Sequence, residues 1–473
     1  MKGDITRNTF DPLKHFTHVL MQQGRVQLDA DFNEQASILL HYIRTLASDI
    51  IGPFGGPAAN LGFEIIVDPK KLSEDDRKRL KAMNMDKAAS GADFLIGKGR
   101  YYVDGLLCEN EYYAIYSSQP DATPGPLKSI AGPYLVYLEV HERHITCAED
   151  DSIREVALGG PDTATRAKLI WQVKVLPLES GTGCGNIKPD WATLMNRWQP
   201  QNRGRLSARA RMPADATDPC TVAPEASYRG AENQLYRVEI HRGTGAANIP
   251  PTFKWSRDNG SVVFPIRTLD GASVVLESLG RDARMGLKPG DWVEIVDDDV
   301  ELNDIPGELR QVADVNVMDM RITLDGPVNR HYDENSKGHP ILRRWDHAAG
   351  DPKRGGSKLD GGAAIIEAGT DTWITLEDGV QVRFEPNVVY LPGDYWLIPA
   401  RTATGDVEWP RQNDQALPRY PHGIIRHYAP LGVISVHADN SVTLLADCRA
   451  GFAPLCYRYG YYGFGAAIGG DEL

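Results

Sequence analysis

The sequence predicts a mainly β protein with an N-terminal α-helix and several small β-barrel or sandwich modules. Strand-like runs separated by turn signals recur from about residue 99 almost to the end of the chain. The 46 Gly and 31 Pro residues also favour a turn-rich β protein. A helical heptad pattern, by contrast, occurs near the N-terminus. A chain of 473 residues is long enough for two or three domains.

The N-terminal helix is expected from about Asp29 to Ile51, after an extended leader. Asp29 or Asp31 can cap its start, and Gly52 followed by Pro53 ends it. Apolar residues recur at alternating spacings of four and three, which places them on one narrow stripe of a helix. These residues are Phe32, Ala36, Leu39, Ile43, Leu46 and Ile50.

The stripe has two interpretations. It joins identical chains or docks them on other proteins, or it packs the helix on its own domain. Fewer than three heptads is short for a stand-alone coiled coil. We take the six stripe residues as interface candidates and expect a homo-oligomer.

Six consecutive segments are predicted. They are the leader and helix (1–52), a β-rich module (53–177), an irregular insertion or linker (178–232), a small barrel-like module (233–345), a β-rich C-terminal module (346–456) and a Tyr- and Gly-rich tail (457–473). The tail carries four further interface candidates, and it either folds onto the body or adds a strand to a neighbouring chain. These candidates are Tyr459, Tyr461, Tyr462 and Phe464.

Within the 53–177 segment, a short polar helix is expected over 72–89, with Ser73 and Asp76 in its first turn. The turn at Asp104-Gly105 predicts a β-hairpin over 99–108. Strands follow at 133–140 and 169–176.

The 233–345 segment predicts a barrel of SH3-like or OB-like kind from four or five short strands. One expected hairpin covers 253–266 and turns at Asp258-Asn259-Gly260. After a Gly-rich loop at 346–362, a second hairpin is predicted over 372–385, around Asp378-Gly379. Strands at 395–400 and within 432–446 complete the prediction.

The net charge of −13 and the pI near 5.4 argue against nucleic acid as the main partner. No window approaches the roughly 18 apolar residues of a transmembrane segment. The first residues show no signal peptide pattern. We therefore expect cytoplasmic assembly, with an extracellular or membrane-anchored particle as the alternative final location.

Two groups of side chains have the chemistry of metal ligands. His141 and His144 lie near Cys147, but on a strand they would point to opposite faces. The acidic run 297–299 with Glu301 could bind calcium, or it could be a solvated strand end. We predict no metal site and no cofactor.

The six cysteines contain no CxxC pair. Cys184 and Cys220 lie in loop-like surroundings and could meet in space. Free thiols are the expectation for a cytoplasmic protein.

No catalytic residue is predicted. The sequence contains no Gly-x-Ser-x-Gly elbow, no P-loop and no dinucleotide fingerprint. A carboxylate pair for glycoside hydrolysis stays open because 64 acidic residues offer many pairs. The tryptophans and tyrosines could form a platform for sugars.

Several segments resemble a bacterial family of uncharacterised function that is associated with phage-tail-like contractile injection systems. The segments are 1–4, 19–35, 153–166, 228–240, 253–260 and 290–294. The segment Gly-Arg-Val-Gln-Leu-Asp-Ala-Asp-Phe-Asn-Glu-Gln, residues 24–35, is also similar to the openings of phage baseplate and tail-fibre proteins.

The resemblance implies a structural component near the baseplate or spike, with other particle proteins of the baseplate, spike or tube as partners. Two alternatives stay open. One is a carbohydrate-binding or carbohydrate-cleaving protein that acts on the cell envelope, and the other is an effector cargo of such a particle.

Overall fold

The computed structural model describes residues 1–82, 93–122, 124, 127, 132–178, 183–211, 228–245, 249–280, 282–303, 305–352 and 355–453. It is mainly β with an N-terminal helix, as predicted. The chain divides into two compact units, each discontinuous in sequence. Unit 1 comprises 1–38, 142–168 and 194–425, and unit 2 comprises 39–141, 169–193 and 426–473. This interleaving differs from the six consecutive segments expected from the sequence.

Helix α1 (Asp29–Ile51) runs from unit 1 into unit 2 and has the predicted bounds. No helix among the described residues is long and apolar enough to cross a membrane. The remaining helices are α2 (Glu74–Ala82), α3 (Cys184–Trp198) and α4 (Asp298–Leu302), with short 3-10 turns at Pro12–Lys14, Ala58–Asn60, Pro69–Lys71, Asp151–Ile153 and Val156–Leu158.

Unit 2 contains three small sheets, with strand orders β28-β1-β4-β5, β2-β3-β6 and β27-β26-β7-β8. The predicted hairpin at Asp104-Gly105 is present as β4 and β5. The strands are β1 (Phe54–Pro57), β2 (Ile65–Ile66), β3 (Leu95–Ile96), β4 (Gly99–Val103), β5 (Leu106–Asn110), β6 (Ala114–Ile115), β7 (Gly132–Ile145), β8 (Arg166–Pro177), β26 (Arg426–Val436), β27 (Val442–Asp447) and β28 (Gly451–Phe452).

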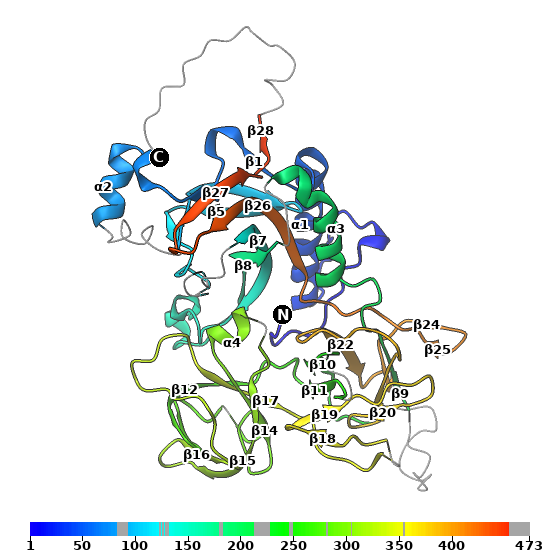
Figure 1. Cartoon of the computed structure of the whole chain (residues 1–473). Helices are drawn as coiled ribbons and strands as arrows, with labels where there is room; N and C mark the ends of the chain where they lie inside the picture. Colours follow the sequence, from blue (N-terminus) through cyan, green and yellow to red (C-terminus); the bar gives the residue numbers. More distant parts are fainter. Residues whose placement is uncertain are drawn as a thin grey trace, which may run out of the picture. The chain divides into compact units, whose positions relative to one another are not determined.

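Unit 1 contains a six-stranded sheet, β18-β19-β11-β10-β22-β23, and a closed barrel, β12-β13-β16-β15-β14-β17 (Figure 1). Two smaller sheets, β20-β21-β9 and β24-β25, accompany them. The strands of the six-stranded sheet are β10 (Gln234–Arg242), β11 (Thr252–Ser256), β18 (Leu359–Asp360), β19 (Ala363–Ile365), β22 (Tyr395–Arg401) and β23 (Asp406–Val407). Those of the barrel are β12 (Val263–Asp270), β13 (Ser273–Leu276), β14 (Trp292–Val296), β15 (Glu308–Asn316), β16 (Arg321–Leu324) and β17 (Ile341–Trp345). The others are β9 (Leu206–Ala210), β20 (Ile374–Thr375), β21 (Val380–Phe384), β24 (Arg411–Gln412) and β25 (Gln415–Ala416).

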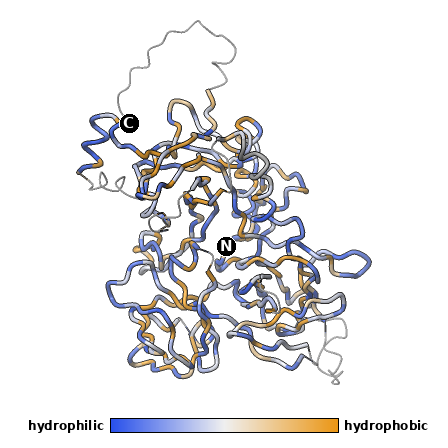
Figure 2. The backbone as a smooth tube through the Cα atoms, in the orientation of Figure 1, coloured by the Kyte–Doolittle hydropathy of each residue, from blue (hydrophilic) through white to orange (hydrophobic). Residues whose placement is uncertain are grey.

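Each sheet system has its own apolar core. Unit 2 has a large core and a small one around Leu80, and separate cores fill the barrel and the six-stranded sheet of unit 1. Helix α2, by contrast, consists mostly of hydrophilic residues, as the hydropathy colours of Figure 2 show. The capping of this helix agrees with the prediction. The Ser73 hydroxyl accepts a hydrogen bond of 3.1 Å from the backbone N–H of Asp76. The rest of the helix expected over 72–89 lies outside the described residues beyond residue 82.

The barrel is confirmed, but its boundaries differ from those predicted. It has six strands, and it begins at Val263 because β10 and β11 belong to the neighbouring sheet. The expected hairpin over 253–266 is therefore wrong. Asn259 and Gly260 do adopt the positive φ of a tight turn, at 53° and 67°. However, β11 pairs with β10 and β19, whereas β12 pairs with β13 and β17.

Two other expectations need correction. The 178–232 segment, expected to be irregular, contains α3 and β9. Cys184 is bonded to Cys448, with 5.4 Å between the Cα atoms, so it is neither free nor paired with Cys220. Cys220 and the tail candidates Tyr459, Tyr461, Tyr462 and Phe464 lie outside the described residues.

The barrel core should depend strongly on Leu342, which is fully buried on β17. Leu342→Ala should lower the free energy of unfolding by roughly 2–5 kcal/mol because it leaves a cavity. Met318 is 91% exposed at the β15–β16 turn, and Met318→Ala should change it by less than about 0.5 kcal/mol. Denaturant unfolding of both variants tests this, and equal effects would contradict the barrel packing.

Candidate functional site

The leader is folded back along the first part of α1. Asp29 accepts hydrogen bonds from the Thr6 amide at 2.8 Å and from the Thr6 hydroxyl at 2.5 Å. Thr9 donates to Glu34, and the amide of Val19 donates to the side chain of Gln35 at 2.7 Å. Partial burial raises the pKa of Asp29, but the bonds from Thr6 outweigh it and the pKa is lowered. The leader has no regular secondary structure apart from the 3-10 turn at Pro12–Lys14. These side-chain contacts hold it against the first part of α1.

One side of α1 faces its own chain. Ala30 and Ile38 are buried there. Further along the helix, the β4–β5 turn approaches so closely that a Cβ on Gly105 would lie 2.2 Å from the carbonyl oxygen of Arg44. Gly105 also has a φ of +79°, so the close approach and the turn geometry both require glycine.

The predicted stripe lies on another side of α1, and all six of its residues are exposed. Its five large side chains are between 52% and 79% exposed. Leu40 and Tyr42, which flank the stripe, are exposed too. Of the 26 exposed large hydrophobic side chains among the described residues, 14 belong to residues 1–51. The leader and α1 thus carry more than half of the large hydrophobic side chains that are exposed among the described residues.

The start of the leader enters a cluster of buried charges in unit 1. The Asn259 side chain donates to the carbonyl oxygens of Met1 at 3.1 Å and Gly3 at 2.8 Å. The Lys2 ammonium lies 3.4 Å from Glu301 and 3.8 Å from Glu239. Turn 258–260, expected to close a hairpin, therefore holds the leader in place.

Strands β10 and β11 supply the sheet side of the cluster. Arg237 and Glu239 stand two residues apart on one face of β10 and form an ion pair of 2.7 Å. Lys254 on β11 lies 3.3 Å from Glu239 and 2.6 Å from Glu294 of barrel strand β14. The Trp345 indole N–H donates to Glu294 at 2.9 Å. Lys254 thus links the sheet to the barrel.

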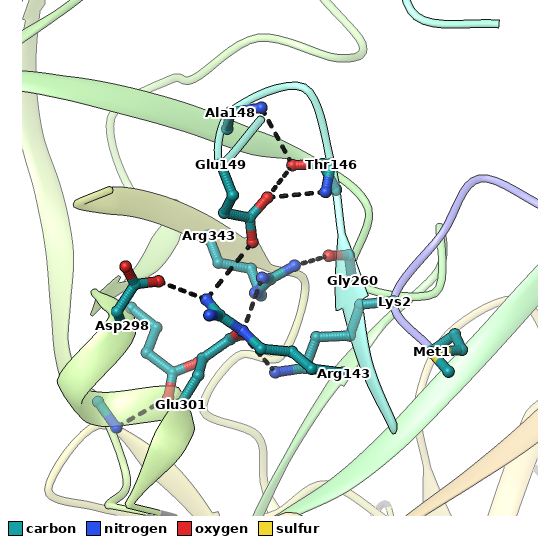
Figure 3. A network of polar contacts seen from close by, with 12 residues as sticks. Met1, Lys2, Arg143, Thr146, Ala148, Glu149, Gly260, Asp298, Glu301 and Arg343 are labelled. Atoms are coloured by element: carbon teal, nitrogen blue, oxygen red, sulfur yellow. Dashed lines mark hydrogen bonds and ion pairs between the residues drawn. The ribbon is translucent and has the colours of Figure 1, made fainter. Parts of the chain in front are cut away.

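Helix α4, strand β7 with the turn after it, and barrel strand β17 supply the remaining charges. Glu301 lies 3.2 Å from Arg143 and 3.4 Å from Arg343 (Figure 3). Arg143 also reaches Asp298 at 2.6 Å and Glu149 at 3.7 Å. We call the ten charged residues the charge cluster: Lys2, Arg143, Arg237, Lys254, Arg343, Glu149, Glu239, Glu294, Asp298 and Glu301.

Burial and ion pairing shift the pKa values of Glu239 and Lys2 in opposite directions. Burial raises the pKa of Glu239, but Lys2, Arg237 and Lys254 outweigh it and hold the pKa well below its usual range. Burial lowers the pKa of Lys2, and the two nearby glutamates oppose that effect. Because five cations meet five anions, the cluster can stay ionised inside the protein. The charge cluster is therefore structural: its ion pairs connect the leader, the six-stranded sheet and the barrel.

The acidic run 297–299 with Glu301 is not a solvated strand end, apart from the exposed Asp299. Asp297 is buried, caps α4 through the Val300 amide at 2.9 Å, and is paired with Arg330. Asp298 and Glu301 belong to the charge cluster. The carboxylates of Asp297, Asp298 and Glu301 are thus paired with arginines and a lysine that come from distant parts of the sequence.

The histidines considered as metal ligands make separate contacts. His141 lies 3.3 Å from Arg426, and His144 lies 2.9 Å from the Thr165 hydroxyl. Among the described residues, no three His, Cys, Asp or Glu side chains are placed to hold a metal ion.

The charge cluster was missed at the level of the sequence, although a signal was present. Arg237, Lys254 and Glu294 are each flanked by bulky apolar residues within predicted strands. A single charge in such a run indicates a strand buried on both faces, with a partner for the charge elsewhere. Four of the segments that carry the family resemblance, 1–4, 228–240, 253–260 and 290–294, supply residues to the cluster or to the turn beside it.

Acid should weaken unit 1 through two glutamates of the cluster. Burial raises the pKa of Glu294 and of Glu301, but the neighbouring cations outweigh it and set both pKa values at about 2, below the ordinary 4.5. The stabilisation is therefore complete above about pH 4.5 and is lost as the pH falls toward about 2. Denaturant unfolding across this window should show the loss, and Glu294→Gln should make it shallower. An unchanged slope in that variant would contradict the assignment.

Removing a buried cation of the charge cluster should lower the free energy of unfolding more than removing an exposed lysine. Lys254→Met leaves Glu239 and Glu294 underpaired and should lower the free energy of unfolding by roughly 3–5 kcal/mol. Lys78→Met is the matched control, because Lys78 forms only an exposed i,i+4 pair with Glu74, worth less than about 1 kcal/mol. The double variant Lys254→Met with Glu294→Gln should lose less than the sum of its two single variants, as double-mutant cycles measure. Strict additivity would show that the two side chains do not interact.

Comparisons with known proteins place the chain in a family. The model of a family described as "Family of unknown function (DUF6519)" matches residues 1–188 and 191–461. The comparisons with curated proteins and with solved structures find no match. The chain belongs to the DUF6519 family.

Proposed function

We propose that this member of the DUF6519 family is a structural subunit that acts by assembly, and that the α1 stripe joins copies of it. The observation that carries the proposal is that the stripe faces solvent and not the chain's own core. Ala30 and Ile38 bury one side of α1 against its own chain, whereas the six stripe residues are exposed. The reading in which the stripe packs on its own domain has no support from these exposures.

The order of residues along the stripe fits pairing between identical helices. Leu39 and Leu46 alternate with Ile43 and Ile50, so that leucine occupies the d positions and isoleucine the a positions of a heptad. This distribution is the one that favours parallel two-stranded coiled coils. Ala36 and Phe32 continue the register toward the leader.

Magnitudes indicate that the stripe supports reversible association. Burying a Leu, Ile or Phe side chain fully is worth about 1.5–3 kcal/mol, and the stripe side chains are already part-covered. Five of them on each of two helices supply on the order of 10 kcal/mol, against an association cost of roughly 4–15 kcal/mol. The oligomer should therefore depend on protein concentration, and the exposed leader residues Leu13, Leu20 and Val26 would add to its stability.

We further propose that the assembly is a phage-tail-like contractile injection particle, with the chain near its baseplate or spike. The support for this step is the resemblance of segments 1–4 and 19–35 described above, together with the exposed apolar surface that the same segments and α1 present. The partners would be other copies of this chain and baseplate, spike or tube proteins. A subunit is present at a fixed copy number in each particle, whereas an effector cargo varies in copy number, so counting copies in purified particles separates the two roles.

Charged substitutions on the stripe test the assembly proposal. Leu39→Asp and Ile43→Asp should abolish the oligomer, because each places a carboxylate in an apolar contact at a cost of several kcal/mol. Native mass measurement or analytical ultracentrifugation over a range of concentrations gives the oligomeric state.

Thr45→Asp is the control, since Thr45 is exposed on the same helix but outside the stripe. It should leave the oligomer intact. Point substitutions are preferable to deletion of the leader, because deletion would also remove Lys2 from the charge cluster. A wild-type chain that is monomeric at every concentration, or an oligomer insensitive to both stripe variants, would overturn the proposal.

A further inference from the structure

A groove of about 700 Å³ lies beside strands β22 and β23 in unit 1. Its walls come from Leu397 and Pro399 of β22, from 408–410 after β23, and from 418–422. Asn8 of the leader completes it. A volume of this size falls in the range of sites for small ligands.

The groove is built on a fixed backbone. Four of its lining residues are prolines, at positions 399, 410, 418 and 421, whose rings restrict φ. The backbone of Arg419 pairs in both directions with Leu206, at 2.9 and 3.1 Å, and its carbonyl accepts the indole N–H of Trp396 at 2.8 Å. A ligand would therefore meet a largely preformed surface, with little entropy lost in ordering it.

Two aromatic residues, Tyr420 and Trp409, line the groove. Tyr420 is 58% exposed, and the Arg205 guanidinium lies 5.5 Å from the centroid of its ring. The Trp409 indole N–H is bonded to the carbonyl of Leu417 at 2.9 Å, which fixes the ring. Trp409 is partly buried, so the exposed ring of Tyr420 provides the main flat apolar face next to polar groups.

The charges at the groove are not balanced. Glu408 is already paired with Arg7 at 2.7 Å and with Arg401 at 3.1 Å. The side chain of Arg419 is exposed, and within the described part of the chain it forms no ion pair. The groove thus presents one uncompensated guanidinium, and a guanidinium binds carboxylate with two parallel hydrogen bonds.

We propose that this groove binds an oligosaccharide that carries a carboxylate, that is, a uronic acid chain. A sugar ring stacks on Tyr420, its carboxylate pairs with Arg419, and Asn8 and His422 offer hydrogen bonds to the hydroxyl groups. This site is independent of the assembly proposed above, because none of its residues belongs to the α1 stripe.

The same features disfavour a proline-rich peptide as the occupant. Such a peptide inserts its own prolines between aromatic side chains. Here the prolines belong to the groove itself, and the unpaired Arg419 would have no partner in an uncharged peptide.

The test uses the full chain with two probes that differ only at the carboxyl groups: a tetramer of galacturonic acid, and the same tetramer with its carboxylates converted to uncharged methyl esters. Calorimetric titration should show the acid bound at least about tenfold more tightly than the ester, the effect of one charge-assisted pair. Arg419→Gln should remove this preference, and Tyr420→Ala should weaken the binding of both probes. Arg321→Gln, at an exposed arginine of the barrel, should change neither.

Three results would overturn the proposal. They are no binding of either probe at millimolar concentration, equal binding of acid and ester, and acid binding that survives Arg419→Gln. Circular dichroism of each variant confirms that it is folded. The stripe variant Leu39→Asp should keep the groove's affinity, so failure of the assembly proposal and failure of this one are distinguishable.

Discussion

The pairing of buried charges around Lys2, Glu239 and Glu301 is the constraint on which the rest of unit 1 depends. A charge removed from water costs several kcal/mol unless it finds partners, so these charges are tolerable only together. They come from the leader, the six-stranded sheet, β7, α4 and the barrel. The buried charges of each element are therefore compensated only when the other elements are in place. The cluster fixes the leader at residues 1–3, and from there Thr6 and Thr9 guide it onto the start of α1.

Helix α1 shows how the chain separates internal from external contacts. Ala30 and Ile38 are apolar residues that are buried on the inward side. The six stripe residues are also apolar, but all of them are exposed. Since hydrophobic burial is the main source of free energy in association, this surface is where the molecule can still gain stability from a neighbour. The single chain is folded and still leaves this apolar surface of α1 uncovered.

Local features of the fold were predictable because a few adjacent residues determine them. The bounds of α1 follow from its heptad spacing and the stop at Gly52, and the β4–β5 hairpin follows from Asp104-Gly105. The turn at Asn259-Gly260 shows the limit of this reasoning, because turn residues set φ but not the strands that pair afterwards. In the candidate site, the heptad spacing predicted the stripe on α1, but it did not predict whether the stripe is buried or exposed. Single charges in apolar strand runs indicated buried charges, but the partners could not be predicted, since the ten residues of the charge cluster come from distant segments and only tertiary contacts, such as the one between Lys254 and Glu294, bring them together.

The pairing of β7 with β26 has a consequence for how the protein is made. His141 and Arg426 face each other in this sheet although 285 residues separate them in the chain. Ribosomes add roughly 5–20 residues per second, so β7 waits on the order of 15 to 60 seconds for its partner strand to emerge. During that time Leu135, Leu138 and Val140, fully buried in the finished sheet, lack the neighbour strand that covers them. Unit 2 therefore completes its fold only after the whole central part of unit 1 has been synthesised, and the nascent chain must be kept from aggregating until then.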